Sequence, residues 1–268
     1  MKSLRGSSPL NSAHAELGAH SSRSESAVIV EAALWEKLGQ SRRNPLDPQW
    51  LGEIYSPSLS HELRRAVSEQ LGLLAARGWP VIASLIERHG PSPDLVHAAG
   101  LCHQEQARDW LLTQLRQNEA ASRHADPALL DALQCWGSAL TLSELSPILQ
   151  APSQSIRLTG LQLLRFKAHQ LDAQALLTLC APCLEDWRDP VTIAAIRLLQ
   201  RRDDPCISNA LAQICRQGSE ASAQAALKAL GCIATQHSRA LLQELADELL
   251  PGERRRQAMR QLEQQLGT

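Results

Sequence analysis

An apolar residue followed three positions later by a small one recurs six times along this chain. The spacings between successive apolar anchors are 32, 34, 27, 35 and 32 residues. A period of this length is typical of helical repeat arrays, in which each unit buries its apolar face against its neighbours. The six anchors are Leu63, Leu95, Leu129, Ile156, Val191 and Ala223.

The small residue has a physical role in such an array. Positions i, i+3, i+4 and i+7 of a helix share one face, so a small side chain at +3 lets the helices of stacked units approach closely. At +7 the residue is apolar in five of the six segments, including Leu198 and Leu230. Gln70 departs from this pattern, and we expect Leu71 beside it to take the core position. The residues at +3 are Ala66, Ala98, Ala132, Thr159, Ala194 and Ala226.

Composition narrows the fold class and the classes of partner. Ala, Leu and Gln dominate and runs of β-branched residues are nearly absent, which predicts an all-α chain. The formal net charge of −1 argues against nucleic-acid binding through net charge. No apolar run reaches the roughly 18 residues that would span a bilayer, and no apolar core follows Lys2 and Arg5 as in a secretory signal. Seven irregularly placed cysteines indicate reduced thiols, so we expect a cytoplasmic protein.

The chain divides into four stretches by pattern. Residues 1–26 are serine-rich and lack a periodic apolar face, so we expect them to be disordered. Residues 27–59 predict an N-terminal helical cap, interrupted by prolines at 45 and 48. The repeat array follows over 60–250. Residues 251–268 predict a C-terminal capping helix, mostly charged and rich in glutamine, with a polar outer face.

Each unit of the array predicts a first helix (helix A), a turn and a second helix (helix B). Ser and Asp are favoured N-caps, and a proline fits the first helical position, as in Asp126-Pro127. Asp204-Pro205 opens a helix B in the same way. The predicted starts of the A helices are Ser60, Ser92, Asp126, Ser153, Asp189 and Ser219.

These units resemble HEAT repeats. The resemblance lies in the Asp-Pro helix starts, the small-residue ladder and the string Ala-Leu-Lys-Ala-Leu-Gly over 226–231, which is close to the short HEAT units of cyanobacterial phycobilin lyase subunits and their relatives. Ile156-Arg157 and Leu63-Arg64 match the apolar-Arg pair of that family. The resemblance implies an α-solenoid, a right-handed superhelix of about six HEAT-like units with a groove that binds a partner. The 34-residue Trp, Gly and Tyr pattern of TPR repeats is not visible.

The HEAT likeness is incomplete in two units. Leu95 and Leu129 are not followed by the arginine of the family's pair; His97 and Asp131 come two residues after them. The resemblance is therefore specific for architecture and much less so for activity.

Cysteine and histidine offer candidate ligands that we weigh against core packing. Cys180 and Cys183 form a C-x-x-C pair, which could be half a zinc site or a redox pair. No second pair exists and no strand precedes it, so we predict that Cys180 continues the apolar face of a helix B and that no metal is bound. His97, Cys102 and His103 also lie close together in the sequence. His97 and Cys102 are five residues apart and point in different directions on a helix, and His103 falls where the chain turns toward helix B, so a ligand role is the less favoured interpretation there.

Arginines spread over several units are the candidate partner-binding residues. If stacking aligns them, they form a basic ridge that docks an acidic protein or a phosphate-bearing ligand; otherwise they belong to a solvated face beside acidic residues. We expect their side chains to be exposed. The candidates are Arg64, Arg157, Arg197 and Arg201.

The function predicted from the sequence is that of a non-catalytic adaptor, scaffold or assembly factor that binds another protein in the groove of the solenoid. No grouping of catalytic side chains can be assembled, so no catalytic residue and no cofactor are expected. The alternative rests on the family resemblance alone: a phycobilin lyase subunit, or a chaperone-like factor, that acts on bilin-bearing proteins and handles a bilin. Membrane binding is not expected, and nucleic acid is disfavoured because aromatic side chains for base stacking are scarce.

Overall fold

The computed structural model describes residues 31–40, 44–120 and 126–267, which are helical and contain no strand. The chain is therefore all-α, as predicted. It divides into two compact units, residues 1–104 and 105–268. The serine-rich stretch 1–26 lies outside the described residues, as does the start of the first predicted helix, which is described as helical from residue 31. A right-handed superhelix over the whole chain stays a prediction.

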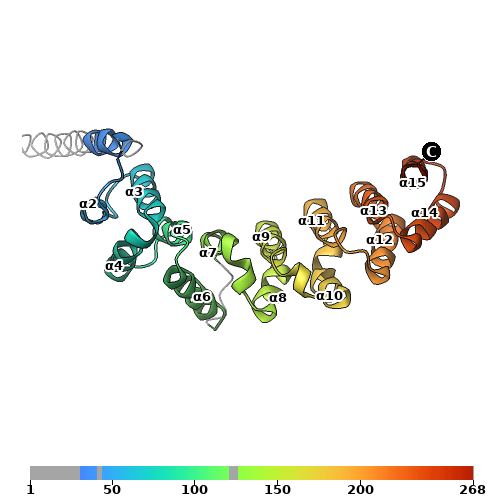
Figure 1. Cartoon of the computed structure of the whole chain (residues 1–268), viewed down its shortest axis with the longest axis horizontal. Coiled ribbons are helices and arrows are strands. Elements are labelled where there is room, and N and C mark those ends of the chain that lie inside the picture. Colours follow the sequence, from blue (N-terminus) through green and yellow to red (C-terminus); the bar gives the residue numbers. More distant parts are fainter. Residues whose placement is uncertain (1–30, 41–43, 121–125, 268) are drawn as a thin grey trace, which may run out of the picture. The chain divides into compact units, whose positions relative to one another are not determined.

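The first unit is a small stack of helices (Figure 1). Helix α3 packs on α5 and on α4, and the short α2 packs on α3 and α4. The predicted helix near Trp50 corresponds to α2, and its N-cap Asp47 accepts a hydrogen bond from the backbone of Gln49. The helices of this unit are α2 (Pro48–Ile54), α3 (His61–Leu73), η2 (Ala75–Arg77), α4 (Trp79–His89) and α5 (Pro93–Leu101).

The second unit stacks helix pairs in two rows (Figure 1). In the row of A helices, α9 contacts α11, α11 contacts α13 and α13 contacts α15; in the row of B helices, α8, α10, α12 and α14 follow one another in the same way. This is the arrangement of a solenoid. The helices are α6 (Glu105–Ala120), α7 (Pro127–Ala132), η3 (Gln134–Ala139), α8 (Leu142–Gln150), α9 (Gln154–Leu164), η4 (Ala168–Gln170), α10 (Ala173–Leu184), α11 (Asp189–Leu199), α12 (Pro205–Gln217), α13 (Glu220–Ile233), α14 (Gln236–Glu248) and α15 (Glu253–Leu266).

Most predicted helix starts are confirmed. Ser92, Asp126 and Ser219 cap α5, α7 and α13 through side-chain hydrogen bonds from backbone N–H groups. Ser60 and Ser153 occupy the N-cap position without such a bond. The start predicted at Asp189 is wrong by one residue, because Arg188 is the N-cap and Asp189 begins α11.

The repeat register is confirmed by burial, with one refinement. All six anchors are buried, and so is Leu71. The residue at +4 is buried more consistently than the small residue at +3. Every +4 residue is buried, whereas Ala66, Thr159 and Ala194 at +3 are only half-buried. At +4, a Cβ on Gly160 would lie 2.8 Å from Ile148 Cγ2, so glycine is needed for α8 and α9 to touch there.

The unit with the shortest spacing departs from the pattern. A full helix A was expected to carry Trp136 at +7, but α7 ends at Ala132 and a 3-10 segment follows. Trp136 has non-helical backbone angles within that segment. Gly137 abuts α9 so closely that a Cβ there would lie 2.6 Å from the carbonyl oxygen of Leu163. The 3-10 segment η3 therefore packs against α9 at the place where a further turn of helix A was expected.

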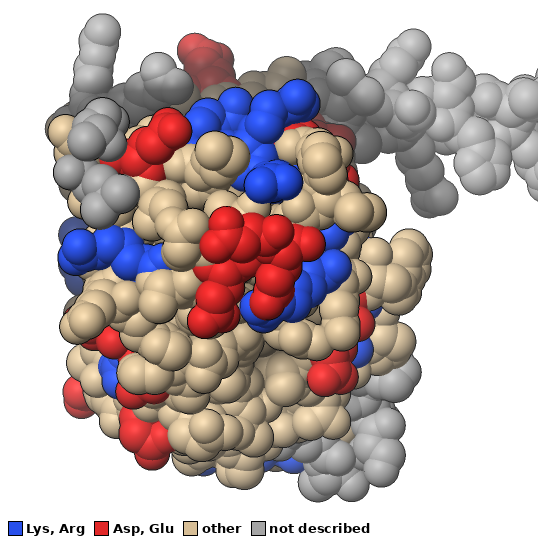
Figure 2. Space-filling view, turned by 90° about the vertical axis from the view of Figure 1, so that its right-hand side faces the viewer, with Lys and Arg blue, Asp and Glu red and all other residues tan. Residues whose placement is uncertain are grey.

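The C-terminal helix α15 lies within the range 251–268 in which a helix was predicted, and it occupies the place of a further helix A beside α13. Ala258 is fully buried, whereas most of its arginines and glutamines are partly or fully exposed. Figure 2 shows the end of the molecule at which α14 and α15 lie, where acidic and basic side chains gather next to one another. A polar end surface of mixed sign suits the last helix of a stack.

Leu230→Ala should destabilise the second unit by about 2–5 kcal/mol, the range for buried leucines, because Leu230 is fully buried on α13. Leu250→Ala is the matched control, since this leucine is 86% exposed and its loss should change stability by less than about 0.5 kcal/mol. Urea denaturation followed by circular dichroism measures both. Equal midpoints for the two variants would contradict the repeat register.

Candidate functional site

A buried carboxylate organises the turn between α10 and α11. The Asp186 side chain is 1% exposed. Its Oδ2 accepts hydrogen bonds from Arg157 Nη1 at 2.9 Å and Arg188 Nη2 at 2.7 Å, and its Oδ1 accepts from Arg188 Nε at 2.8 Å and from the Arg188 backbone N–H at 2.9 Å. The carboxylate thus joins α9 to the start of α11.

The two arginines explain why this carboxylate stays ionised although it is buried. Hydrogen bonds from Arg188, followed by the charges of Arg188 and Arg157, hold the pKa of the Asp186 carboxyl below its usual range and outweigh the opposing effect of burial. The same bonds raise the pKa of Arg188. Charge-assisted pairs of this kind are strong and directional, so they fix the geometry of the turn.

Trp187 lies between these two anchored neighbours and is 87% exposed. Both Asp186 and Arg188 turn toward the protein, and the indole is left in solvent. The Arg188 guanidinium lies 5.6 Å from the centroid of the Trp187 ring, within the range of a cation–π contact. A large aromatic side chain is thus presented on a turn whose backbone is held from both sides.

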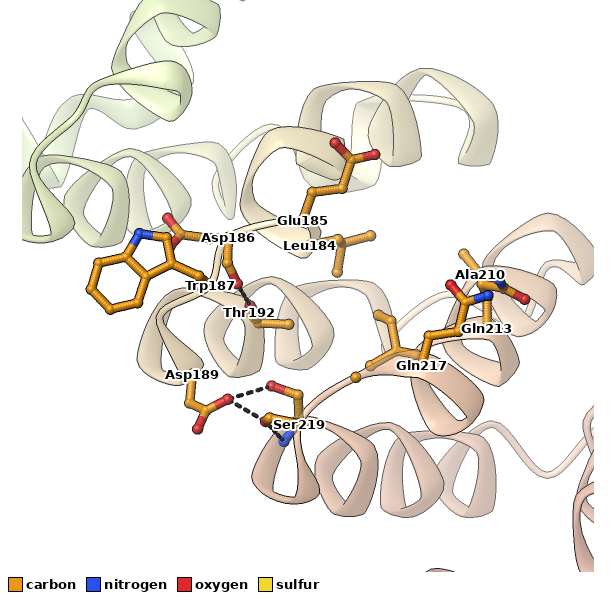
Figure 3. A pocket seen from close by; sticks show the side chains of 13 residues that line it. Leu184, Glu185, Asp186, Trp187, Asp189, Thr192, Ala210, Gln213, Gln217 and Ser219 are labelled. Atoms are coloured by element: carbon orange, nitrogen blue, oxygen red, sulfur yellow. Dashed lines mark hydrogen bonds between the residues drawn. The ribbon is translucent and has the colours of Figure 1, made fainter. Parts of the chain in front are cut away.

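An open groove of about 460 Å³ begins beside Trp187. Figure 3 shows the indole at one end and the side chains of Gln213 and Gln217 on α12 at the other. Apolar atoms make up most of its lining, which also includes the polar side chains of Gln213, Gln217 and Glu185. Its lining includes Leu184, Glu185, Trp187, Thr192, Ala210, Gln213, Ile214 and Gln217.

Hydrogen bonds hold one wall of the groove in place. Thr192 Oγ1 donates to the backbone carbonyl of Asp186 at 2.8 Å. The Asp189 carboxylate accepts from the hydroxyl of Ser219 and, at 3.0 Å, from that of Ser222, so it ties the start of α11 to the start of α13. Figure 3 draws these bonds. The groove is therefore bounded by elements that are already fixed.

Two predicted partner-binding arginines serve the structure instead of facing solvent. Arg157 is only 16% exposed, and besides Asp186 it donates to the backbone carbonyls of Gln150, Ala151 and Pro182. The expectation that it is exposed is wrong. The physical reason is that helix and turn ends of two successive units present unpaired carbonyl groups there, which a guanidinium satisfies.

Arg64 has the same role in the first unit. It is 26% exposed, its Nε lies 3.3 Å from Asp94 Oδ2 and its Nη1 donates to the carbonyls of Pro57 and Leu59. The apolar-Arg pairs that resemble the HEAT pattern are thus links between successive repeats. Their predicted exposure is corrected in both units.

Arg197 and Arg201 are exposed, as predicted. Together with Arg165 they line a second, smaller groove of about 300 Å³ between α9 and α11. None of the three has an ion-pair partner among the residues that the structure describes. Of the four predicted residues, only these two lie together at one groove.

Sequence reasoning missed Trp187. A signal was available, because Glu185-Asp186-Trp187-Arg188-Asp189 places one aromatic residue within a run of charged ones just before an Asp-Pro helix start. A core tryptophan would be expected on the apolar face of a helix. A tryptophan in a charged turn has no core to enter, and that indicates a surface role.

The cysteine pair lies in the core. Cys180 and Cys183 are fully buried on α10, and the Cys183 thiol lies 3.5 Å from the carbonyl oxygen of Leu149. Burial raises the pKa of Cys180 to about 12 and that of Cys183 to about 11. The prediction that Cys180 continues the apolar face of its helix is confirmed.

The other candidate ligands, His97 and Cys102, have separate surroundings. Cys102 is buried at the end of α5, while His97 lies 3.8 Å from Glu69 Oε1. Within the described part of the chain, no three His, Cys, Asp or Glu side chains are grouped so that they could hold a metal ion. No helix described here has both the length and the apolar character that crossing a bilayer requires.

Comparison with solved structures gives several distant likenesses, of which two follow. A designed armadillo repeat protein matches with 15% sequence identity and a TM-score of 0.39, over 81% of this chain and 99% of that chain. An engineered protein matches with 15% identity and a TM-score of 0.35, over 83% of this chain and 97% of the other. No family model and no curated protein matches the chain. The all-α assignment therefore rests on the helices described above.

Asp186→Asn should cost about 3 kcal/mol at pH 7, because it leaves two arginines without their shared carboxylate. The folded-state pKa of Asp186 is depressed, so its stabilisation is complete above the unfolded pKa near 4 and is lost as the pH falls through the folded value. The difference between wild type and variant should therefore shrink toward about pH 3 in urea denaturation. Asp203→Asn, at an exposed aspartate, is the control and should change little. A pH-independent difference would contradict this account.

Thiol labelling should separate the cysteines by burial. At pH 8 Cys135 and Cys232, which are exposed, should react first, whereas Cys102, Cys180, Cys183 and Cys215 should react only after unfolding, because burial raises the pKa of each of these four thiols. Mass spectrometry of the labelled peptides identifies each site. Replacing Cys135 and Cys232 by serine should remove the fast phase. Rapid labelling of Cys180 would reopen the redox interpretation of the pair.

Proposed function

We propose that this chain is a protein-binding scaffold and that the groove beside Trp187 is a docking site for a partner protein. The observation that carries the proposal is the 87% exposure of Trp187 at the mouth of an apolar groove. Tryptophan is among the residues most enriched at binding hot spots, where it packs into or against a pocket of the partner. The indole can pack into a pocket of the partner, and the groove beside it can receive a side chain of the partner.

The composition of the groove fits a protein segment. Leu184 and Ile214 provide apolar surface, and Gln213, Gln217 and Glu185 provide hydrogen-bonding groups in the same lining. Protein interfaces usually combine apolar contact with hydrogen bonds in this way. The groove volume of about 460 Å³ accommodates a few apolar side chains of the partner.

The anchored turn favours binding further. Asp186 holds the backbone on one side of Trp187 and Arg188 on the other, so the indole is presented from a fixed position. A site that is already ordered loses less conformational entropy when a partner arrives. The buried ion pairs thus contribute to recognition through the residue that they leave exposed.

Trp187→Ala should weaken partner capture by at least about tenfold, since hot-spot truncation costs on the order of 2 kcal/mol or more. The test is quantitative pull-down from the native host with mass spectrometry, followed by titration of the captured protein. Leu250→Ala is the matched control, because Leu250 is 86% exposed and lies away from the groove lining. Equal capture by wild type and Trp187→Ala would refute the docking site.

The bilin alternative stays a prediction from the sequence resemblance. Its test is direct: a bilin bound by the purified protein changes its visible absorbance. Binding of a bilin together with a Trp187→Ala variant that captures partner normally would favour the lyase-like function over the scaffold.

A further inference from the structure

We propose that the smaller groove between α9 and α11 is a second, independent site that binds an acidic peptide segment. In this arrangement carboxylates of the segment pair with Arg165, Arg197 and Arg201, and an apolar side chain packs on Leu158, Leu161 and Leu198. The inference goes beyond the Trp187 site, because it concerns other residues and a ligand of defined charge.

The helices bring the three arginines to the lining of one groove. Helices α9 and α11 are neighbours in the row of A helices. Arg165 is the C-cap of α9, Arg197 lies in the last turn of α11 and Arg201 follows four residues later. The leucines form an apolar floor between them, with Leu161 and Leu198 buried and Leu158 half-buried.

The charge of this groove is not neutralised by the described parts of the chain. Elsewhere in the same unit, arginines reach carboxylates of neighbouring helices: Arg216 lies 3.0 Å from Glu248, and Arg254 lies 2.8 Å from Glu220. Such partners are lacking for the three groove arginines within the described residues. Three cations around one groove repel each other, and a carboxylate ligand removes that repulsion.

A purely structural role explains the groove less well. Cations at a helix C-terminus interact favourably with the helix dipole, which would account for Arg197 and Arg165. Arg202 shows what a structural arginine does at this end of the unit, since it donates to the carbonyls of Ala168 and Leu171. Arg201 makes no such bond to the described residues and lines the groove instead.

The lining favours a peptide over a nucleic acid. Arginine binds a carboxylate with two parallel hydrogen bonds, and the leucine floor suits an aliphatic side chain. Single-stranded nucleic acid is bound on stacked aromatic rings, and the residues that line this groove include none. An acidic segment with an embedded leucine therefore matches both the charge and the floor.

The test uses fluorescence anisotropy with the full chain and a labelled synthetic peptide in which glutamates flank one leucine. Arg197→Glu with Arg201→Glu should raise the Kd by at least about tenfold, and the wild-type Kd should rise with salt. The matched control is Lys228→Glu with Arg239→Glu, which makes the same change in net charge at two exposed residues without an ion partner among the described residues, and it should bind as wild type does. Arg197→Gln with Arg201→Gln gives a milder change should the double reversal unfold.

Three results would overturn the proposal. The first is an unchanged Kd in both arginine variants. The second is an equal loss in the Lys228 and Arg239 control, which would mean attraction to net charge alone. The third is tighter, arginine-dependent binding of a single-stranded oligonucleotide than of the peptide. Trp187→Ala should leave the Kd of this peptide unchanged, so the outcome is separate from that of the Trp187 site.

Discussion

Contact between successive A helices is the constraint on which the second unit depends. A pair of helices has too little surface to bury its own apolar face, so each unit completes its core against the next. Every residue at +4 is buried, and Gly160 shows how closely α9 also approaches α8, the helix B that precedes it. Where a helix A is short, as in α7, the close approach of Gly137 to α9 maintains the contact.

Polar bonds between units follow the same spacing as the apolar contacts. Arg157 reaches Asp186, Asp189 reaches Ser222, and Arg254 reaches Glu220, each linking one repeat to the next. Helix ends carry carbonyl and N–H groups without partners inside the helix, and these side chains satisfy some of them. Some polar surface residues thus bond one repeat to the next, and others make no bond between repeats.

The residues that the stack leaves unused define two grooves of different chemistry. At one, Trp187 and apolar atoms suit a partner that brings its own apolar side chains. At the other, arginines without carboxylate partners among the described residues suit an acidic segment. A repeat protein presents its surface unit by unit, so neighbouring junctions can hold separate sites without a shared active centre.

The sequence by itself determined the all-α class, the repeat period, most helix starts and the core register, because caps and apolar periodicity act over a few residues. It also picked out Arg197 and Arg201. Only the tertiary structure decided that Arg157 is a link between repeats and that Trp187 stands beside a groove, although the charged turn around Trp187 already indicated a surface residue. The physical reason is distance along the chain: Arg157 meets Asp186 29 residues later, and whether an arginine is paired or free depends on which carboxylates and carbonyls folding brings to it.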